Sequence, residues 1–258
     1  MRPGGAKTQA GNLEKKRISR RRFLEALGGL AIVAGAAGVL WEMWRPKLNP
    51  AKPVRANAYT QDGKSLVSIA EGKPDTDVET MVRHAVDALG GIGNIVSTGK
   101  TVVVKPAVLT SDPGCAPDPR VVAAVAKLAK EAGGTVIVAE SSGGGDTRYC
   151  LSQVGIASAA EKVGAEVRAL PLEEGILMEV PKGVSLRDVR TFPTIYNCDV
   201  LISVPRLKRH TATAVTMSLK NMMGVVPDYE KRRFHSTDLS QCIADLNTVL
   251  KPDLTVLD

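Results

Sequence analysis

Short runs of β-branched residues alternate with segments of helical periodicity along this chain, and this alternation is the strongest constraint on its fold. The clearest apolar runs are 101–105 and 135–139, and between them residues 120–132 place apolar side chains at helical spacing before Gly133 and Gly134. Strands joined by helices pair in parallel, because each helix returns the chain to the edge where the next strand starts. The sequence therefore predicts an α/β fold, a mainly parallel sheet with helices on both faces.

The remaining segments continue this pattern, with one irregular stretch at 171–193. We expect further helices over 149–163 and 238–250, and further strands over 165–170, 199–204 and 254–257. The last of these strands stands at the end of the chain without a covering helix. We therefore expect the domain to be truncated at its C-terminal end.

The N-terminal region carries a targeting pattern. Residues 19–25 read Ser-Arg-Arg-Arg-Phe-Leu-Glu and precede an apolar run over 26–40, an order typical of a twin-arginine signal helix. The run falls short of the roughly 20 residues that span a bilayer, so a membrane anchor reaching Trp44 is the alternative. We expect the twin-arginine translocation machinery to export the folded chain to the periplasm or the outer face of the cytoplasmic membrane, with membrane contact through this N-terminal segment.

The small-x-small sequence Ala56-Asn57-Ala58 resembles a cleavage site, which predicts a signal and linker over 1–58 and an α/β domain over 59–258. The same division explains the net charge of +7: residues 1–58 hold 12 Lys and Arg against 3 Asp and Glu, which leaves −2 for the remainder. A nearly neutral domain with few aromatic side chains offers neither a phosphate-binding surface nor base-stacking platforms. Nucleic acid is not an expected partner.

The four cysteines are dispersed and include no Cys-x-x-Cys pair, so the usual local framework of a zinc site or an iron–sulfur cluster is absent from the sequence. We therefore predict no metal ligands, and no motif identifies a cofactor. Buried, unpaired cysteines are the favoured interpretation, although export would permit disulfides that the spacing cannot assign.

Polar residues follow the predicted strands, where open α/β sheets bind their ligands. Lys105 ends the first strand, and a polar loop beginning with Ser141 and Ser142 follows the second. This loop could bind an anion through its N–H groups, or it could be a turn in which Asp146 caps the next helix. It lacks the spacing of a nucleotide-binding fingerprint.

The densest group of basic residues lies between 206 and 235. A lysine and a histidine beside a strand end can hold an anion and transfer a proton near neutral pH. Lys220 stands in the apolar run 217–226, where a solvated charge is not expected, and its alternative role is a lysine that reaches the surface along its apolar stem. For Arg232 and Arg233 we favour a surface role. The candidate catalytic residues are Lys208, His210 and Lys220, and the candidate ligand-binding residues are Lys105, Ser141, Ser142, Asn221 and His235.

Four segments together resemble the domain of unknown function 362 family, in its twin-arginine-exported branch: 102–106, 198–210, 218–226 and 252–258. The distinctive part is Lys208-x-His210 followed by Leu219-Lys220-Asn221-x-x-Gly224. The resemblance implies an α/β domain, and ferredoxin-like segments in some relatives imply a redox partner.

This chain departs from the family pattern at two positions. Ala107 and Ser203 stand where relatives often have Asn, which removes amide groups from the expected site.

Two functions fit these observations. The first is an enzyme that binds a small anionic or carbonyl-containing ligand at the strand ends, with a redox-linked reaction supplied by an external donor. The second is a non-catalytic binding or assembly factor for a metal or iron–sulfur partner, with His210 and His235 as ligands. The enzyme interpretation requires Lys105, Lys208, His210 and Lys220 to meet in one pocket.

Overall fold

The central sheet of the computed structural model, which describes residues 47–258 except residue 74, has five parallel strands in the order β11-β8-β3-β4-β5. Their bounds are β3 Thr101–Pro106, β4 Thr135–Glu140, β5 Glu166–Ala169, β8 Val200–Val204 and β11 Leu254–Thr255. In the middle of the sheet Val103 is in register with Ile137 on one side and Leu201 on the other. The predicted parallel α/β architecture is confirmed, whereas the predicted signal helix lies outside the described residues.

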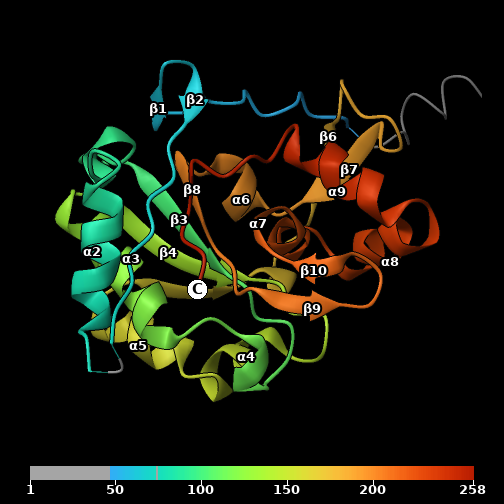
Figure 1. Ribbon diagram of the computed structural model, residues 1–258. Helices are drawn as coiled ribbons and strands as arrows, with labels where there is room; N and C mark the ends of the chain where they lie inside the picture. The colour runs from blue at the N-terminus through green and yellow to red at the C-terminus, as the bar shows by residue number, and fades with distance from the viewer. Residues whose placement is uncertain (1–46, 74) are drawn as a thin grey trace, which may run out of the picture. The chain divides into compact units, whose positions relative to one another are not determined.

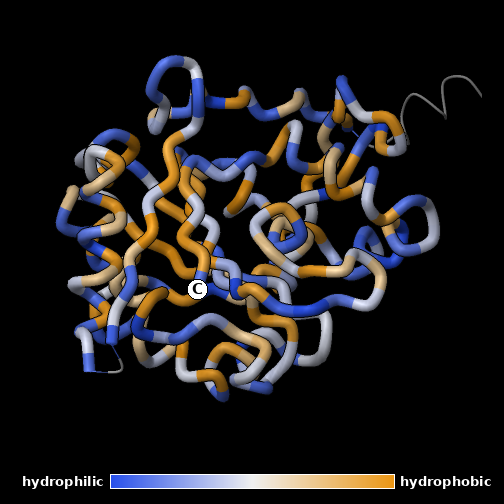
Figure 2. The backbone as a smooth tube through the Cα atoms, viewed as in Figure 1, coloured by the Kyte–Doolittle hydropathy of each residue, from blue (hydrophilic) through white to orange (hydrophobic). Residues whose placement is uncertain are grey.

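Side chains that alternate along each strand pack into two separate cores, so helices cover both faces (Figure 1). On one face Val102 and Val104 contact a layer that contains α2 Val78–Asp87, α3 Pro119–Glu131, α4 Thr147–Gln153 and α5 Ile156–Lys162. On the other face Val103 belongs to a core that contains residues of α6 Pro193–Asn197, η4 Met222–Val225, α8 Asp228–Ser236 and α9 Leu239–Asn247. Figure 2 shows the strands as largely hydrophobic segments between these layers.

Three parts of the chain differ from the expectation. The helix predicted over 149–163 is two helices, α4 and α5, because Gly155 between them has a φ of 78°. The irregular stretch contains an antiparallel hairpin of β6 Ile176–Glu179 and β7 Asp188–Thr191. The residues after β8 form a second hairpin, β9 Lys208–His210 and β10 Ala214–Thr216, followed by the short helix α7 Ser218–Asn221.

The segment before the predicted boundary at Ala58 packs against the α/β unit. Asn49 exchanges two backbone hydrogen bonds with β6, at 2.9 and 3.0 Å. The Lys52 Nζ donates to the carbonyl of Ile195, and Arg55 makes a two-point ion pair with Asp253. Residues 48–258 therefore form one compact unit. Cleavage after Ala58 would remove these contacts, and whether it occurs stays a prediction.

Shorter elements complete the unit: β1 Thr60–Gln61 and β2 Lys64–Ser65 form a small hairpin, and single 3-10 turns span Ile92–Asn94, Pro113–Cys115 and Leu170–Leu172. All four cysteines are free, and three of them, Cys150, Cys198 and Cys242, are buried. Within 47–258, residue 74 aside, no helix combines the length and the apolar character that crossing a bilayer requires.

Candidate functional site

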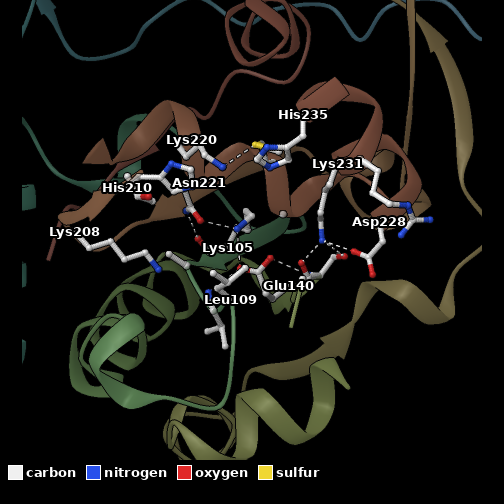
Figure 3. A pocket seen from close by; sticks show the side chains of 18 residues that line it. Lys105, Leu109, Glu140, Lys208, His210, Lys220, Asn221, Asp228, Lys231 and His235 are labelled. Carbon is white, nitrogen blue, oxygen red and sulfur yellow. Dashed lines mark hydrogen bonds and ion pairs between the residues drawn. The ribbon is translucent and has the colours of Figure 1, made fainter. Parts of the chain in front are cut away.

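A pocket of about 370 Å³ opens beyond the carboxyl ends of β3 and β4, under the β9–β10 hairpin, α7 and α8 (Figure 3). Seven of the eight predicted site residues line it: Lys105, Ser141, Lys208, His210, Lys220, Asn221 and His235. The eighth, Ser142, does not, because its hydroxyl donates to the Val108 carbonyl at 2.9 Å. The four residues that the enzyme interpretation needs therefore meet in one pocket.

The loop that carries Ser141 and Ser142 leads directly into α4. Asp146 at its end caps that helix by accepting a hydrogen bond from the Tyr149 N–H at 2.7 Å. This is the simpler of the two roles that the sequence allowed.

The floor of the pocket is a fully hydrogen-bonded ion pair. Lys105 is 1% exposed, and its ammonium donates to the Pro106 carbonyl at 2.9 Å, to Glu140 at 2.8 Å and to the Asn221 side chain at 2.7 Å. These acceptors use all three of its N–H groups. Burial lowers the pKa of Lys105, while the Glu140 carboxylate acts in the opposite direction.

The partners of Lys105 are held equally firmly. Glu140 also accepts the backbone N–H of Val108 at 3.0 Å and of Ser141 at 2.7 Å. Asn221 donates to the Lys105 carbonyl at 3.2 Å and to the Ser203 hydroxyl at 2.9 Å. We call Lys105, Glu140 and Asn221 the floor group. Its hydrogen bonds join β3, β4, β8 and α7, so its direct role is to position the pocket.

The residues that surround this floor are less buried, and we call Lys208, His210, Lys220, Lys231, Arg232 and His235 the outer group. The ammonium of Lys220 lies 3.0 Å from the thioether sulfur of Met223, and within the described part of the chain no oxygen atom accepts a hydrogen bond from it. Burial, followed by the charges of Lys208 and Lys231, lowers the pKa of Lys220. Lys220 is thus a half-buried amine to which residues 47–73 and 75–258 supply no counter-ion.

His210 is fixed in one tautomer by the turn of its own hairpin. Its Nδ1 accepts the backbone N–H groups of Ala212 at 3.1 Å and Thr213 at 3.2 Å, so the neutral ring carries its hydrogen on Nε2. Burial, and then the charges of Lys220, His235 and Lys208, lower the pKa of His210. A neutral imidazole that presents Nε2–H is a hydrogen-bond donor first, and it accepts a proton only if the Nδ1 bonds break.

Two lysines of the outer group are tied to the protein. Lys208 donates to the Cys115 carbonyl at 2.8 Å, which leaves two of its N–H groups without a partner in the described ranges. Lys231 donates to the carbonyl and hydroxyl of Ser141 at 2.6 and 2.9 Å and to Asp228 at 2.9 Å. Lys231 therefore has its counter-ion, whereas Lys208 keeps donors for a ligand.

The pocket carries an excess of positive charge. Five Lys and Arg side chains line it against two carboxylates, Glu140 and Asp228, and these two are paired with Lys105 and Lys231. Of the five cationic side chains, Lys208, Lys220 and Arg232 have no carboxylate partner among the described residues that line the pocket. Among residues 47–73 and 75–258 no three or more His, Cys, Asp or Glu side chains are grouped as metal ligands would be.

The model of the family described as "Domain of unknown function (DUF362)" matches residues 102–258, more than half of the chain. The chain belongs to this family. All of the lysines and histidines in the floor and outer groups lie inside the matched range. The pocket is thus built by the DUF362 domain itself.

The chain is also 30% identical over 186 residues to a protein named thylakoid-associated protein sll1697 from Synechocystis sp. (strain ATCC 27184 / PCC 6803 / Kazusa). The match covers 69% of this chain and 57% of that relative, so the chain spans little more than half of the relative's length.

Sequence reasoning missed several residues of the DUF362 pocket, above all Glu140, Lys231 and Arg232. Glu140 ends a buried strand adjacent to the one that ends in Lys105, which was a readable signal for an ion pair. The α8 residues Asp228, Lys231, Arg232 and His235 share one side at helical spacing, whereas Arg233 turns away to pair with Asp188. Arg232 is exposed, as its expected surface role requires, and it also lines the pocket.

Proposed function

We propose that the DUF362 domain of this chain binds a small anion, a carboxylate or a phosphate, in the pocket at the carboxyl ends of β3 and β4. The observation that carries the proposal is the ammonium of Lys220, which faces the pocket with a thioether as its polar neighbour. A half-buried cation without a counter-ion is costly, and a bound anion would remove that cost.

Further features favour a small ligand of this kind. A volume of about 370 Å³ accommodates a small molecule rather than a polymer segment. Lys208 retains N–H groups without a partner in the described part of the chain, and His210 presents Nε2–H to the same pocket, so a charged and a neutral donor line one space. The Lys105–Glu140 pair below them supplies a rigid floor on which the ligand would lie.

The proposal is tested by titrating the 258-residue chain with inorganic phosphate and, separately, with pyruvate or acetate at constant ionic strength, using calorimetry and thermal unfolding. A ligand present at 100 times its dissociation constant should stabilise the fold by about 2.7 kcal/mol. Lys220→Met should weaken binding about tenfold, the effect of one lost charge-assisted contact of about 1.4 kcal/mol.

Lys162→Met is the matched control, because Lys162 is an exposed lysine at the end of α5 outside the pocket. It should leave the affinity unchanged. Stabilisation equal to that of chloride for every anion, with no difference between the two variants, would contradict the proposal. The phosphate and carboxylate titrations distinguish the two ligand classes.

We further propose export by the twin-arginine pathway, supported by the order of residues 19–25 and the apolar run that follows. Replacing Arg20 and Arg21 by lysine should keep the chain in the cytoplasm when cells are fractionated, whereas Arg17→Lys should not. A redox-linked step and the role of an assembly factor stay predictions.

A further inference from the structure

The surroundings of the Lys220 amine suit a nucleophile better than a charge that stabilises the fold. It sits in the pocket wall, half-buried, and in the described part of the chain it contacts no carboxylate. Its cationic neighbours and its burial both favour the neutral amine, the form that attacks carbonyl carbon. Lys105, on the pocket floor, is the opposite case, since all of its N–H groups are donated within the protein.

The groups near Lys220 suit a ligand that carries a carbonyl beside an acid. Lys208, whose charge acts on Lys220, offers N–H groups to a carboxylate, and the Nε2–H of His210 can donate to a carbonyl oxygen. A neutral histidine that polarises a carbonyl does so without adding another full charge beside the lysines. A short-chain 2-oxo acid carries both a carboxylate and an adjacent ketone, and it is small enough for the pocket.

We infer that Lys220 forms an imine with the ketone carbon of a small 2-oxo acid held by Lys208, an inference that rests on the proposed anion pocket. The nitrogen of Lys220 forms a bond to the carbonyl carbon, and the carbon–oxygen double bond opens to a hydroxyl group. Loss of that hydroxyl as water gives the iminium. Starting from the ammonium form, two of its three hydrogens leave in the water and one remains on nitrogen, so no proton, oxidant or reductant is consumed.

The test is reductive trapping of the 258-residue chain with pyruvate and cyanoborohydride, whose hydride reduces the iminium to a stable secondary amine. Modified lysines are then located by peptide mass spectrometry. We expect Lys220 to be modified about tenfold faster than the exposed Lys162, because the pocket would hold the pyruvate ketone beside its amine. The lowered pKa of Lys220 acts in the same direction, since it favours the neutral amine. Buried Lys105 should remain unmodified.

Three companion measurements show whether the pocket directs the reaction. Acetone, which has the ketone without the carboxylate, should modify Lys220 far more slowly than pyruvate. Inorganic phosphate should compete with pyruvate for the pocket. Lys220→Arg keeps the charge but cannot form the imine, so it should bind pyruvate and lose the adduct.

The outcomes separate this inference from the proposed function. If pyruvate binds to the folded chain but Lys220 is modified no faster than Lys162, the imine is wrong and the anion pocket stands. If pyruvate and phosphate both fail to bind and modification is uniform among exposed lysines, both proposals fail. Selective modification of Lys220 that the carboxylate accelerates supports both.

Discussion

The pocket contains two lysines whose surroundings are opposite, and the contrast separates positioning from chemistry. Lys105 is the more buried, yet its charge is matched by Glu140 and each of its N–H groups has an oxygen acceptor. Lys220 is less buried, and a thioether is its polar contact. Burial alone would rank Lys105 as the unusual residue. The hydrogen-bond partners of the two ammonium groups indicate instead that Lys220 is the one available to a ligand.

The largest expected effect is on stability, from the same substitution made at both positions. Lys105→Met leaves the buried Glu140 carboxylate without its cation and should cost about 3–5 kcal/mol. Lys220→Met removes a charge that has no ion-pair partner among the described residues, and it should change the free energy of unfolding by less than about 1 kcal/mol. Urea unfolding measures both, with an unchanged slope as the check on two-state behaviour.

A second substitution separates the ion pair from simple packing. In Lys105→Met combined with Glu140→Gln no buried carboxylate is left unpaired, so the double variant should be more stable than Lys105→Met alone. Equal losses for Lys105→Met and Lys220→Met would contradict the contrast between the two lysines.

The next largest effect tests how closely the floor group is enclosed. A Cβ added at Gly224 would lie 2.6 Å from the Lys105 Nζ and would overlap the Glu140 carboxylate. Gly224→Ala should therefore destabilise the fold by about 1–3 kcal/mol, the usual cost of overpacking a buried site. Gly143→Ala, at the loop side of the pocket, meets a flexible leucine side chain at 3.1 Å and should cost less. Thermal unfolding of the two variants side by side gives the comparison.

Much of the fold could be predicted from the sequence, because apolar runs and helical spacing indicate the parallel strands and the helices between them. The single helix expected over 149–163 failed at Gly155, where a positive φ, invisible in the spacing, starts a second helix. The β9–β10 hairpin was also missed, since a basic surface run resembles a loop. Its pairing, however, is what brings His210 and Lys208 over the pocket.

The candidate site was predicted as a set of residues but not as a set of partners. The rule that ligands meet the carboxyl ends of parallel strands places Lys105 and Ser141 together, and the pocket contains both. That rule does not predict the ion pair between Lys105 and Glu140. Nor does it predict that Lys231, 90 residues further along the chain, donates a hydrogen bond to Ser141. Such contacts depend on long-range packing, which single-sequence patterns do not encode.

A smaller effect concerns the pH dependence of anion binding. The folded pKa of Lys220 lies below its ordinary value of 10.5, so the ammonium that attracts an anion is present below the lowered pKa and is lost as pH rises through it. Phosphate affinity should therefore fall with rising pH before free lysine titrates. In Lys220→Arg the charge persists and this fall should be absent.

The same titration has a consequence for stability without ligand. Between the lowered pKa and 10.5 the unfolded chain binds more protons at Lys220 than the folded chain does. The free energy of unfolding should therefore rise with pH in this window, and the rise should be missing in Lys220→Met. A rise of equal size in that variant would assign the effect to other groups.

The smallest expected effect comes from the one outer lysine that resembles Lys105 in having a counter-ion. Asp228 is 53% exposed and pairs with Lys231, so Asp228→Asn should change stability by less than about 1 kcal/mol. It should nevertheless release part of the Lys231 charge into the pocket and raise phosphate affinity about two- to threefold. Calorimetric titration of this variant beside Lys220→Met tests the principle behind the contrast: removing a counter-ion strengthens anion binding, and removing an unpartnered cation weakens it. If Asp228→Asn weakens phosphate binding instead, the net positive charge of the pocket does not control anion binding, and the principle behind the contrast is wrong.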